Sequence, residues 1–405
     1  MKKPRILFLC AVPPFGGSGA SIRTLHIARA LEQIGDLQIA LTSNREWTDD
    51  QIERTKSEFR LVHMFRLLPR PLGGLVDRFR HATSATHLNT HALGVSDADT
   101  RILNQLLDVS NLTWIHTFKV ANSLERFFWP SSVIDVDDYP SHFAASALPH
   151  APLLVPKLKR LRDYFAWRRR ESVWRNRFSA LAVCKDSDIG HFGGGSRVNV
   201  VPNGFDVPEP ARPRLPVSEA HCLGMIGDFA YLPNLDGVTW FVRTCWPAVR
   251  AAEPSATLRL VGKDSIDLAR RLSSEGIVGL GYVADTGPEI ASWSAMIVPT
   301  RLGGGTHLKV AEGLARKVPI VTTPHGARGY NLDHCRHAMI ASDSVHFSKA
   351  CINLLRDSDL RDNLTANGRE LFEANYSPGA IKRAVEKSVE AGLAYRDSSN
   401  IELGR

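Results

Sequence analysis

Residues 301–321, RLGGGTHLKVAEGLARKVPIV, place three consecutive glycines before a helix-like run that carries Lys309 and Glu312. Glycines let backbone amides approach a phosphate without a Cβ in the way, and a helix start adds partial positive charge. Because Lys309 and Glu312 are three residues apart, they share one helix face. Lys309 could neutralise a diphosphate, and Glu312 could accept hydrogen bonds from a ribose diol. The pattern by itself fits a flexible turn and a surface ion pair equally well.

The neighbouring sequence predicts how these side chains are positioned. The run SAMIVPT, residues 294–300, has the length and apolar character of a buried strand. The glycines at 303–305 would form the loop after this strand, and Thr306 is a suitable N-cap for a helix that continues through Lys317. We therefore expect a glycine loop that joins a buried strand to a helix.

The composition indicates a soluble globular protein with two domains. The 405 residues are too many for one ordinary core and suit two domains of roughly 200 residues each. The 43% hydrophobic and 23% charged residues are typical of a soluble globular protein. No run in the sequence approaches the roughly 20 apolar residues of a membrane-spanning helix. The net charge of +8 favours an anionic partner such as a nucleotide, a phospholipid surface or a nucleic acid.

The first strand and the cysteines indicate the compartment. RILFLCAV, residues 5–12, predicts a buried strand and not a signal peptide, because no small-residue cleavage pattern follows it. The six cysteines are scattered without a CxxC pair, and most have apolar neighbours. We expect buried thiols in a reducing, cytoplasmic compartment and not a disulfide or zinc framework.

Short β-branched runs alternate with amphipathic helical runs along most of the chain, which predicts an α/β protein with parallel sheets covered by helices on both faces. At residues 198–216 a proline-rich stretch can sustain neither a helix nor a central strand. We expect one Rossmann-like domain at 1–205, a second at 206–375, and a helix with a tail at 376–405. The strand-end loops of two such domains would face a shared cleft, where doubly wound sheets bind ligands.

Further candidates lie at strand ends in the first half. His116 comes at the end of the predicted strand LTWIHTF, and the ordinary interpretation of a lone histidine there is a buried residue satisfied by the backbone. VIDVDDYPS places Asp135 and Asp137 on one side of a strand end, with Asp138 able to cap the following element. These carboxylates could hold a metal or act as a base, and the alternative is a structural role.

The loop GGSGAS, residues 16–21, invites comparison with a dinucleotide-binding motif. Gly17 and Gly19 fit the first two glycines of GxGxxG, but Ile22 occupies the third position and no acid ends the second strand. The NAD pattern therefore fails, whereas Arg45 leaves an NADP variant open.

Taken in order, these stretches resemble retaining GT-B glycosyltransferases of family 4. The resemblance covers nearly the whole chain, with GGSGASIRTLHIARAL at 16–31 similar to the family's N-terminal loop and first helix. In the second half it rests on residues 200–206, 224–241, 258–264, 301–321 and 318–330.

This resemblance implies the GT-B fold, in which two Rossmann-like doubly wound domains face a central cleft. The second domain would hold most of a nucleotide-diphosphate sugar, and the final helix would return to the first domain. The sugar would be transferred with retention at the anomeric carbon, by attack of the acceptor hydroxyl on the face that the diphosphate leaves. No metal site and no cofactor besides the donor substrate are implied, so the resemblance favours a structural or acceptor-side role for Asp135, Asp137 and Asp138.

Carried over by position, Glu312 matches the second of the family's two glutamates, which holds the ribose. Gly304 stands where the first glutamate would be, eight residues earlier. The family's arginine and lysine after the first strand of the second domain are also replaced, by Asp228 and Asn234. We expect other cations to bind the diphosphate in their place, namely Arg301, His307 and Lys309.

His116 matches a histidine that lies near the donor sugar in the family, so we expect it to contact the sugar without acting as a nucleophile. Gly16 and Gly17 would close over the donor phosphates or border the acceptor. The expected donor-binding residues are Gly16, Gly17, Gly227, Arg301, Gly304, Gly305, Thr306, His307, Lys309 and Glu312. The expected catalytic residues are His116, Lys309 and Glu312.

Residues 155–178, VPKLKRLRDYFAWRRRESVWRNRF, interleave Lys and Arg with aromatic and aliphatic side chains. Such a helix can lie on an anionic membrane surface, which would place the protein at the inner membrane face. The alternative is a solvated helix whose aromatics pack into the first domain. Nucleic acid is not expected as a partner, because no recognisable reading module is present.

We therefore predict a retaining glycosyltransferase that moves a sugar from a nucleotide-diphosphate sugar to a hydroxyl of a glycan, lipid-linked or small-molecule acceptor. The expected context is the synthesis of cell-surface polysaccharide or glycoconjugate. Two alternatives stay open: a nucleotide-sugar epimerase of the same fold, and a non-catalytic protein that binds a nucleotide-sugar or a membrane.

Overall fold

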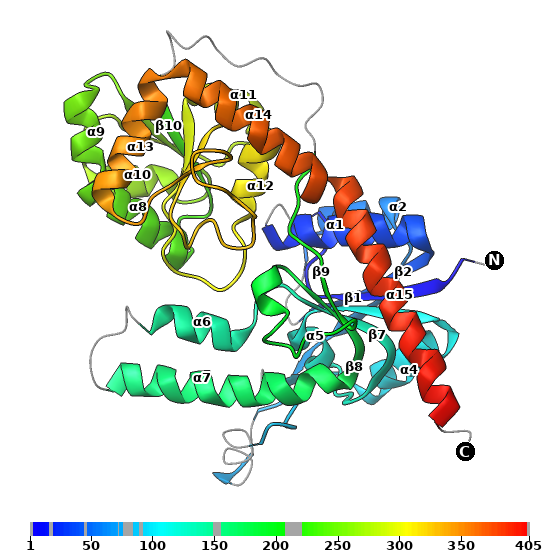
Figure 1. Ribbon diagram of the computed structural model, residues 1–405. Helices are drawn as coiled ribbons and strands as arrows, with labels where there is room; N and C mark the ends of the chain where they lie inside the picture. The colour runs from blue at the N-terminus through cyan, green and yellow to red at the C-terminus, as the bar shows by residue number, and fades with distance from the viewer. Residues whose placement is uncertain are drawn as a thin grey trace. The chain divides into compact units, whose positions relative to one another are not determined.

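The computed structural model describes residues 3–15, 19–43, 47–71, 73–75, 84–88, 92–148, 155–206 and 221–402 (Figure 1). The chain divides into two compact units, one formed by residues 1–202 with 381–405 and the other by residues 203–380. Each unit has its own parallel sheet and its own hydrophobic cores, so each is described by itself.

The first unit is built on a seven-stranded parallel sheet with the order β3-β2-β1-β6-β7-β8-β9. Its interior strand β1 (Arg5–Cys10) is buried after its first residue, as expected of a sheet that helices cover on both faces. The strand order reverses between β1 and β6 (Leu112–His116), where Cys10 and His116 are neighbours in register. The other strands of the unit are β2 (Asp36–Ser43), β3 (Leu61–Arg66), β7 (Trp129–Val136), β8 (Phe178–Val183) and β9 (Val198–Val200), with a separate pair β4 (Leu68–Pro69) and β5 (Leu93–Gly94).

Helices pack on both faces of this sheet (Figure 1). On one face, Ile381, Val385 and Val389 of the C-terminal helix α15 (Pro378–Glu402) share a core with Phe8 of β1. On the other face, Phe118 and Trp174 belong to a second core. The remaining helices of the unit are α1 (Gly19–Ile34), α2 (Asp49–Glu58), α4 (Asp97–Val109), α5 (Phe118–Ser123), α6 (Pro140–Ala147) and α7 (Val155–Trp174).

The second unit repeats this plan with six parallel strands in the order β12-β11-β10-β13-β14-β15. Here the order reverses between β10 (Cys222–Ile226) and β13 (Ala295–Val298). The other strands are β11 (Thr257–Val261), β12 (Ile277–Gly281), β14 (Ile320–Thr322) and β15 (Met339–Ile340). The helices are α8 (Leu232–Thr244), α9 (Trp246–Ala252), α10 (Ser265–Leu272), α11 (Gly287–Ala291), α12 (Leu308–Ala315), α13 (Ser344–Arg356) and α14 (Ser358–Asn375).

Two doubly wound α/β bodies are what the alternation of strands and helices predicts, but some element boundaries differ. The run LDGVTWFVRTCWPAV, residues 235–249, predicts a single helix, but the structure has two helices that meet at Cys245. Pro247 lies in the first turn of α9, where its missing amide hydrogen costs nothing, so the chain starts a new helix there.

Two sequence-based predictions concern the cysteines and membrane-spanning helices. All six cysteines are free thiols, and all are buried except Cys335, which is exposed. In the described part of the chain, we find no helix whose length and apolar character would let it span a bilayer.

Candidate functional site

In the second unit, the loops after β10 and β13 meet at the edge where the strand order reverses, the usual place for a ligand in a doubly wound sheet. Gly227 follows β10, and its amide donates to Val261 O at 2.9 Å. Gly262 has φ of +126°, and a Cβ on it would lie 2.1 Å from Gly227 O. The backbone segments after β10 and β11 are therefore too close to tolerate a side chain at residue 262.

The loop after β13 differs in detail from the prediction. The helix α12 begins at Leu308, so its N-cap is His307 and not Thr306, and the His307 side chain makes no capping hydrogen bond. Thr306 Oγ1 instead accepts a hydrogen bond from Asn203 Nδ2 at 2.7 Å. The helix also ends at Ala315, before Lys317, which adopts a left-handed φ of +55°.

Of the three loop glycines, Gly303 has the positive φ that favours glycine. Gly303 has φ of +116°, which side chains rarely adopt, whereas Gly304 and Gly305 are not among the positive-φ glycines of the described residues. The loop can therefore turn sharply at Gly303 while its following amides lead into the start of α12.

Lys309 is a half-buried cation with spare hydrogen-bonding capacity. Its Nζ donates to Asn234 Oδ1 at 2.7 Å, and Asn234 Nδ2 in turn donates to Asp228 O at 2.8 Å. Its two other ammonium hydrogens have no acceptor among the described residues. Burial lowers the pKa of Lys309 to about 8, with the nearby Glu312 carboxylate acting in the opposite direction. Lys309 is therefore mostly protonated at neutral pH.

Glu312 lies one turn further along α12 and is 8% exposed. Its Oε1 accepts from Arg316 Nε at 3.0 Å and from Thr286 Oγ1 at 3.3 Å. Its Oε2 accepts no hydrogen bond from the described residues. Burial raises the pKa of Glu312, and the Arg316 charge opposes this shift. One oxygen is thus fixed by the protein, and the other is left for a donor such as a hydroxyl.

Arg301 is in a different situation, because its charge is already balanced. Its Nε and Nη2 donate to the two carboxylate oxygens of Asp236 at 3.1 and 2.8 Å. The guanidinium also lies 5.4 Å from the ring centre of Trp240, within cation–π distance. His307 lies beside His325, with ring centres 6.0 Å apart. Arg301 is thus hydrogen-bonded to a carboxylate, whereas Lys309 is hydrogen-bonded only to the neutral Asn234.

The predicted residue in the first unit, His116, belongs to a buried charged network. His116 Nδ1 lies 2.7 Å from Asp135 Oδ2, and Asp135 is fully buried. Arg23 Nε donates to the same oxygen at 3.2 Å, its Nη2 donates to Asp135 Oδ1, and its Nη1 donates to Val201 O at 3.0 Å. Burial alone would raise the pKa of Asp135, but Arg23 and His116 hold it at about 2.

An ionised Asp135 accepts the Nδ1 hydrogen of His116 and so orients the imidazole at the end of β6. Burial alone would lower the pKa of Arg23, but Asp135 raises it above its ordinary value. Within this network the charges are therefore mutually satisfied.

The other predicted residues of the first unit have separate surroundings. Asp137 accepts from the Cys184 thiol at 2.9 Å. The sequence suggests Asp138 as a cap for the following element. The N-cap of α6 is instead Tyr139, one residue later. In the described part of the chain, no three His, Cys, Asp or Glu side chains gather as a metal site would require. Gly16, Gly17 and Arg45 lie outside the described residues.

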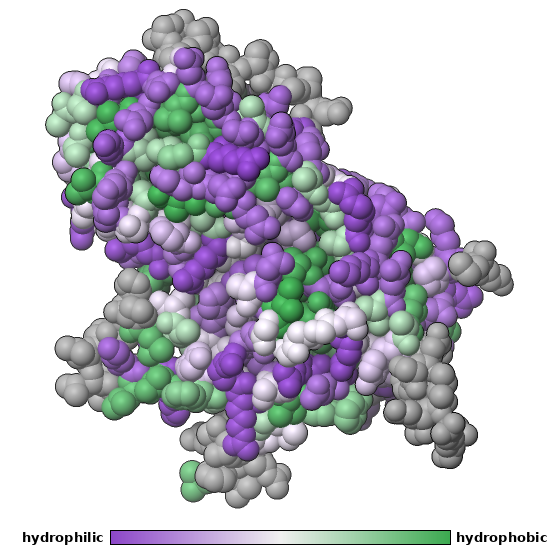
Figure 2. Space-filling view, viewed as in Figure 1, coloured by the Kyte–Doolittle hydropathy of each residue, from purple (hydrophilic) through white to green (hydrophobic). Residues whose placement is uncertain are grey.

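Residues 155–178 form α7, a short 3-10 turn and the first residue of β8. Trp174 and Phe178 pack into the core, as the solvated-helix interpretation requires. Leu158, Leu161 and Phe165 are exposed at spacings of three and four residues, and so share one face of the helix. Figure 2 shows hydrophobic surface interspersed with hydrophilic surface along α6 and α7.

The sequence analysis missed several partners of the site residues. Arg316 lies four residues after Glu312, a helical spacing that could have revealed their ion pair. Thr286 and Arg23 gave no such local signal, because their partners are 26 and 112 residues away in the sequence.

Residues 220–357 match the family described as glycosyl transferases group 1. An uncharacterised 44.6 kDa protein in the cps region of Klebsiella pneumoniae is 22% identical over 171 residues, which cover 40% of this chain and 44% of that protein. The match therefore spans less than half of the length of this curated relative.

Solved structures resemble nearly the whole chain. HepE of Anabaena, crystallised with UDP-glucose, is 15% identical with a TM-score of 0.65, covering 96% of this chain and 100% of HepE. WaaG, a glycosyltransferase involved in lipopolysaccharide biosynthesis, is 14% identical with a TM-score of 0.58, covering 95% of this chain and 98% of WaaG. These similarities confirm the predicted GT-B fold, and the family match confirms the predicted glycosyltransferase domain within the second unit.

Proposed function

We propose that this protein is a retaining glycosyltransferase of family 4 that moves a sugar from a nucleotide-diphosphate sugar to an acceptor hydroxyl. The observation that carries this proposal is that Lys309 and Glu312 on α12 both have unused hydrogen-bonding capacity. They lie where the strand order reverses, in the part of the chain that matches the group 1 glycosyl transferases. A cation with two uncommitted donors suits a diphosphate, and a carboxylate oxygen three residues further on suits a ribose diol.

The chemistry follows from where charge develops. The bond between the anomeric carbon and the diphosphate oxygen breaks, a bond to the acceptor oxygen forms, and the departing diphosphate takes the acceptor proton. Lys309 and the loop amides before α12 stabilise the negative charge on the diphosphate. His116, oriented by Asp135, contacts the donor sugar. In this proposal the reaction uses the donor and the acceptor without a further cofactor.

A role in cell-surface polysaccharide or glycoconjugate synthesis is supported by two of the comparisons. The Klebsiella relative is encoded in a cps region, and WaaG takes part in lipopolysaccharide biosynthesis. We take UDP-sugars as the first donors to test, because HepE was crystallised with UDP-glucose. The acceptor in this proposal is a glycan, a lipid-linked glycan or a small molecule.

We also propose that α7 brings the protein to the cytoplasmic face of an anionic membrane. The exposed Leu158, Leu161 and Phe165 offer an apolar face, and the exposed Arg162 and Arg169 offer cations beside it. When vesicles of phosphatidylglycerol are sedimented, the wild type should be found in the vesicle pellet. A variant with Leu158→Ser and Phe165→Ser should stay in the supernatant. Equal retention of both proteins would contradict this part of the proposal.

The proposed activity is tested first with a thermal-shift panel of UDP-, GDP-, ADP- and TDP-glucose. One nucleotide family should raise the Tm, and incubation of that donor with acceptor glycans should give a new glycoside, whose anomeric configuration NMR then compares with the donor's. Inversion of that configuration would contradict retention. Conversion of the donor alone into an epimer would favour the epimerase, and binding without turnover on any acceptor would favour a non-catalytic protein.

A further inference from the structure

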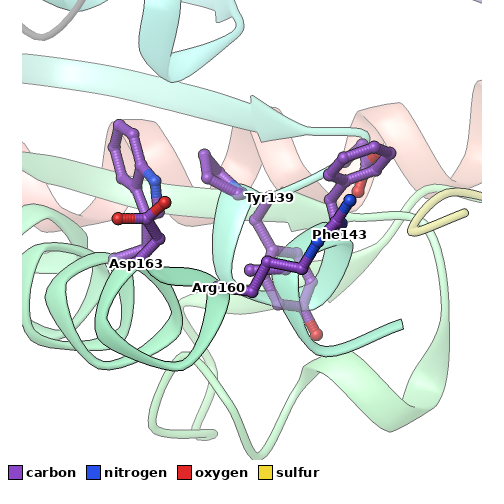
Figure 3. A pocket seen from close by; sticks show the side chains of 8 residues that line it. Tyr139, Phe143, Arg160 and Asp163 are labelled. Carbon is purple, nitrogen blue, oxygen red and sulfur yellow. The ribbon is translucent and has the colours of Figure 1, made fainter. Parts of the chain in front are cut away.

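A pocket of about 560 Å³ lies between the segment after β7, helix α6 and helix α7 in the first unit. This volume is within the range of small-molecule binding sites. The side chains that matter for its chemistry are Asp138, Tyr139, Phe143, Arg160, Asp163 and Trp167. Figure 3 shows Arg160 and Asp163 on α7, with Tyr139 and Phe143 contributed from the segment after β7 and from α6.

Neighbouring side chains fix the positions of two aromatic rings of the pocket, Trp167 and Tyr139. Trp167 contacts Trp174, with ring centres 5.9 Å apart, and the Arg170 guanidinium lies 4.9 Å from the Trp167 ring centre. Tyr139 donates its hydroxyl hydrogen to Asp188 at 3.1 Å, and its ring centre is 4.4 Å from that of His191. Trp167 is partly exposed, so a ligand that stacks on it would find this ring already ordered, which reduces the entropic cost of binding. Tyr139 is only 6% exposed and forms part of the pocket wall.

The polar side chains of the pocket include both acceptors and a donor. Asp138 is exposed, and Asp163 is half-buried with one oxygen, Oδ1, accepting from Arg162 at 2.8 Å. Arg160 has neither a hydrogen bond nor an ion pair with any described residue. The pocket thus offers carboxylate oxygens and free guanidinium hydrogens beside aromatic surfaces.

This combination selects a class of ligand. A pyranose ring has an apolar face of C–H groups and a rim of hydroxyls that both donate and accept hydrogen bonds, so it matches ordered aromatic rings bordered by carboxylates and an arginine. A diphosphate is disfavoured, because two carboxylates would repel it. The pocket also lies at the carboxyl edge of the sheet, since Asp138 is two residues after the end of β7 and β7 pairs with the strand that ends at His116.

We propose that this pocket binds a pyranose residue of the acceptor glycan, with Trp167 against the ring and Asp138, Asp163 and Arg160 on its hydroxyls. The proposal rests on the glycosyltransferase function proposed above and names the substrate class on the acceptor side. It makes these side chains determinants of acceptor specificity with no part in holding the nucleotide.

The test is binding of the full-length protein to arrayed bacterial capsular and lipopolysaccharide oligosaccharides, each displayed free and as a lipid-linked conjugate. Trp167→Ala should lower binding at least tenfold and Asp163→Asn several-fold. Phe128→Ala is the matched control, because Phe128 is an exposed aromatic outside the pocket and its loss should change nothing. Equal binding of both displays indicates recognition of the sugar alone, and preference for the conjugate adds contact with the exposed face of α7.

Calorimetric titration with UDP keeps this test separate from the proposed function. UDP affinity should be the same in the wild type and in all three variants. The pocket assignment is overturned if the wild type binds no arrayed glycan, or if Asp163→Asn and Trp167→Ala both bind as the wild type does. Because Trp167 packs on Trp174, a Trp167→Ala protein that fails to fold leaves Asp163→Asn to decide the question. Glycan binding without UDP binding would uphold the pocket and contradict the proposed donor site.

Discussion

The two units have the same kind of sheet, and each places charged side chains where its strand order reverses, but the charges are satisfied to different extents. In the first unit, Arg23, Asp135 and His116 bind one another inside the protein. In the second unit, Lys309 has a single neutral partner and Glu312 keeps one oxygen without a hydrogen bond from the described residues.

This difference teaches how to separate a framework from a binding site when the topology is the same. A buried network whose members satisfy one another holds its elements in place, and breaking it leaves an uncompensated charge. A cation and a carboxylate with unused donors and acceptors are costly for the empty protein and gain from a ligand. Substitutions in the network of Arg23, Asp135 and His116 should therefore reduce stability, whereas substitutions of Lys309 and Glu312 should reduce ligand affinity.

The largest effect is expected from Asp135→Ala. Removing this carboxylate leaves the Arg23 charge buried without its partner, so the free energy of unfolding should fall by about 3–5 kcal/mol. Urea unfolding followed by tryptophan fluorescence measures this change. The control is Asp163→Ala, whose pair with Arg162 is exposed and should be worth about 0–1 kcal/mol. Equal losses in the two variants would contradict the description of the buried Asp135 network as a framework.

Lys309→Ala should give the next largest effect, in affinity and not in stability. Loss of a charge-assisted hydrogen bond of about 1.5–3 kcal/mol predicts a weakening of UDP binding by about 10- to 100-fold. Arg301→Ala is the informative comparison, because Asp236 already balances that charge, and it should weaken UDP binding by less. Isothermal titration calorimetry measures both, and a larger effect at Arg301 would reverse our assignment of the main cation.

UDP affinity should also depend on pH through Lys309. Only the protonated amine attracts the diphosphate, and burial places its pKa at about 8. Affinity should therefore be full near pH 7, where the terminal phosphate is already ionised, and should fall about tenfold by pH 9 as the proton is lost. The same titration with Lys309→Ala should show no such fall. A pH dependence shared by both proteins would point to another group.

Glu312→Gln should have the smallest effect. An amide in place of the carboxylate weakens hydrogen bonds from the ribose by about 1 kcal/mol, so UDP should bind about three- to fivefold less tightly. Inorganic pyrophosphate has no ribose and should bind both proteins equally well. If pyrophosphate affinity fell as much as UDP affinity, Glu312 would act on the phosphates and not on the sugar.

Much of the fold could be predicted from the sequence, because each buried strand is a short apolar run and each covering helix is amphipathic. Lys309 and Glu312 could also be found together, since a spacing of three residues places them on one helix face whatever surrounds them. A local pattern of this kind depends only on residues that are close together in the sequence.

The partners that complete each site could not be predicted in the same way. Asp135 meets Arg23 across 112 residues, and Lys309 meets Asn234 across 75 residues, so both pairs depend on how the elements pack. The helix start at Leu308 was also missed, because Thr306 has good capping chemistry but bonds to Asn203 instead. In these places tertiary contacts override a local preference.

The most direct test of the donor site is a crystal structure of the full-length protein with the UDP-sugar that binds it. We predict diphosphate oxygens within hydrogen-bond distance of Lys309 Nζ and ribose hydroxyls against Glu312 Oε2, with both groups otherwise placed as they are now. A nucleotide bound elsewhere, with Lys309 still donating to Asn234 alone, would contradict the proposed function of the second unit.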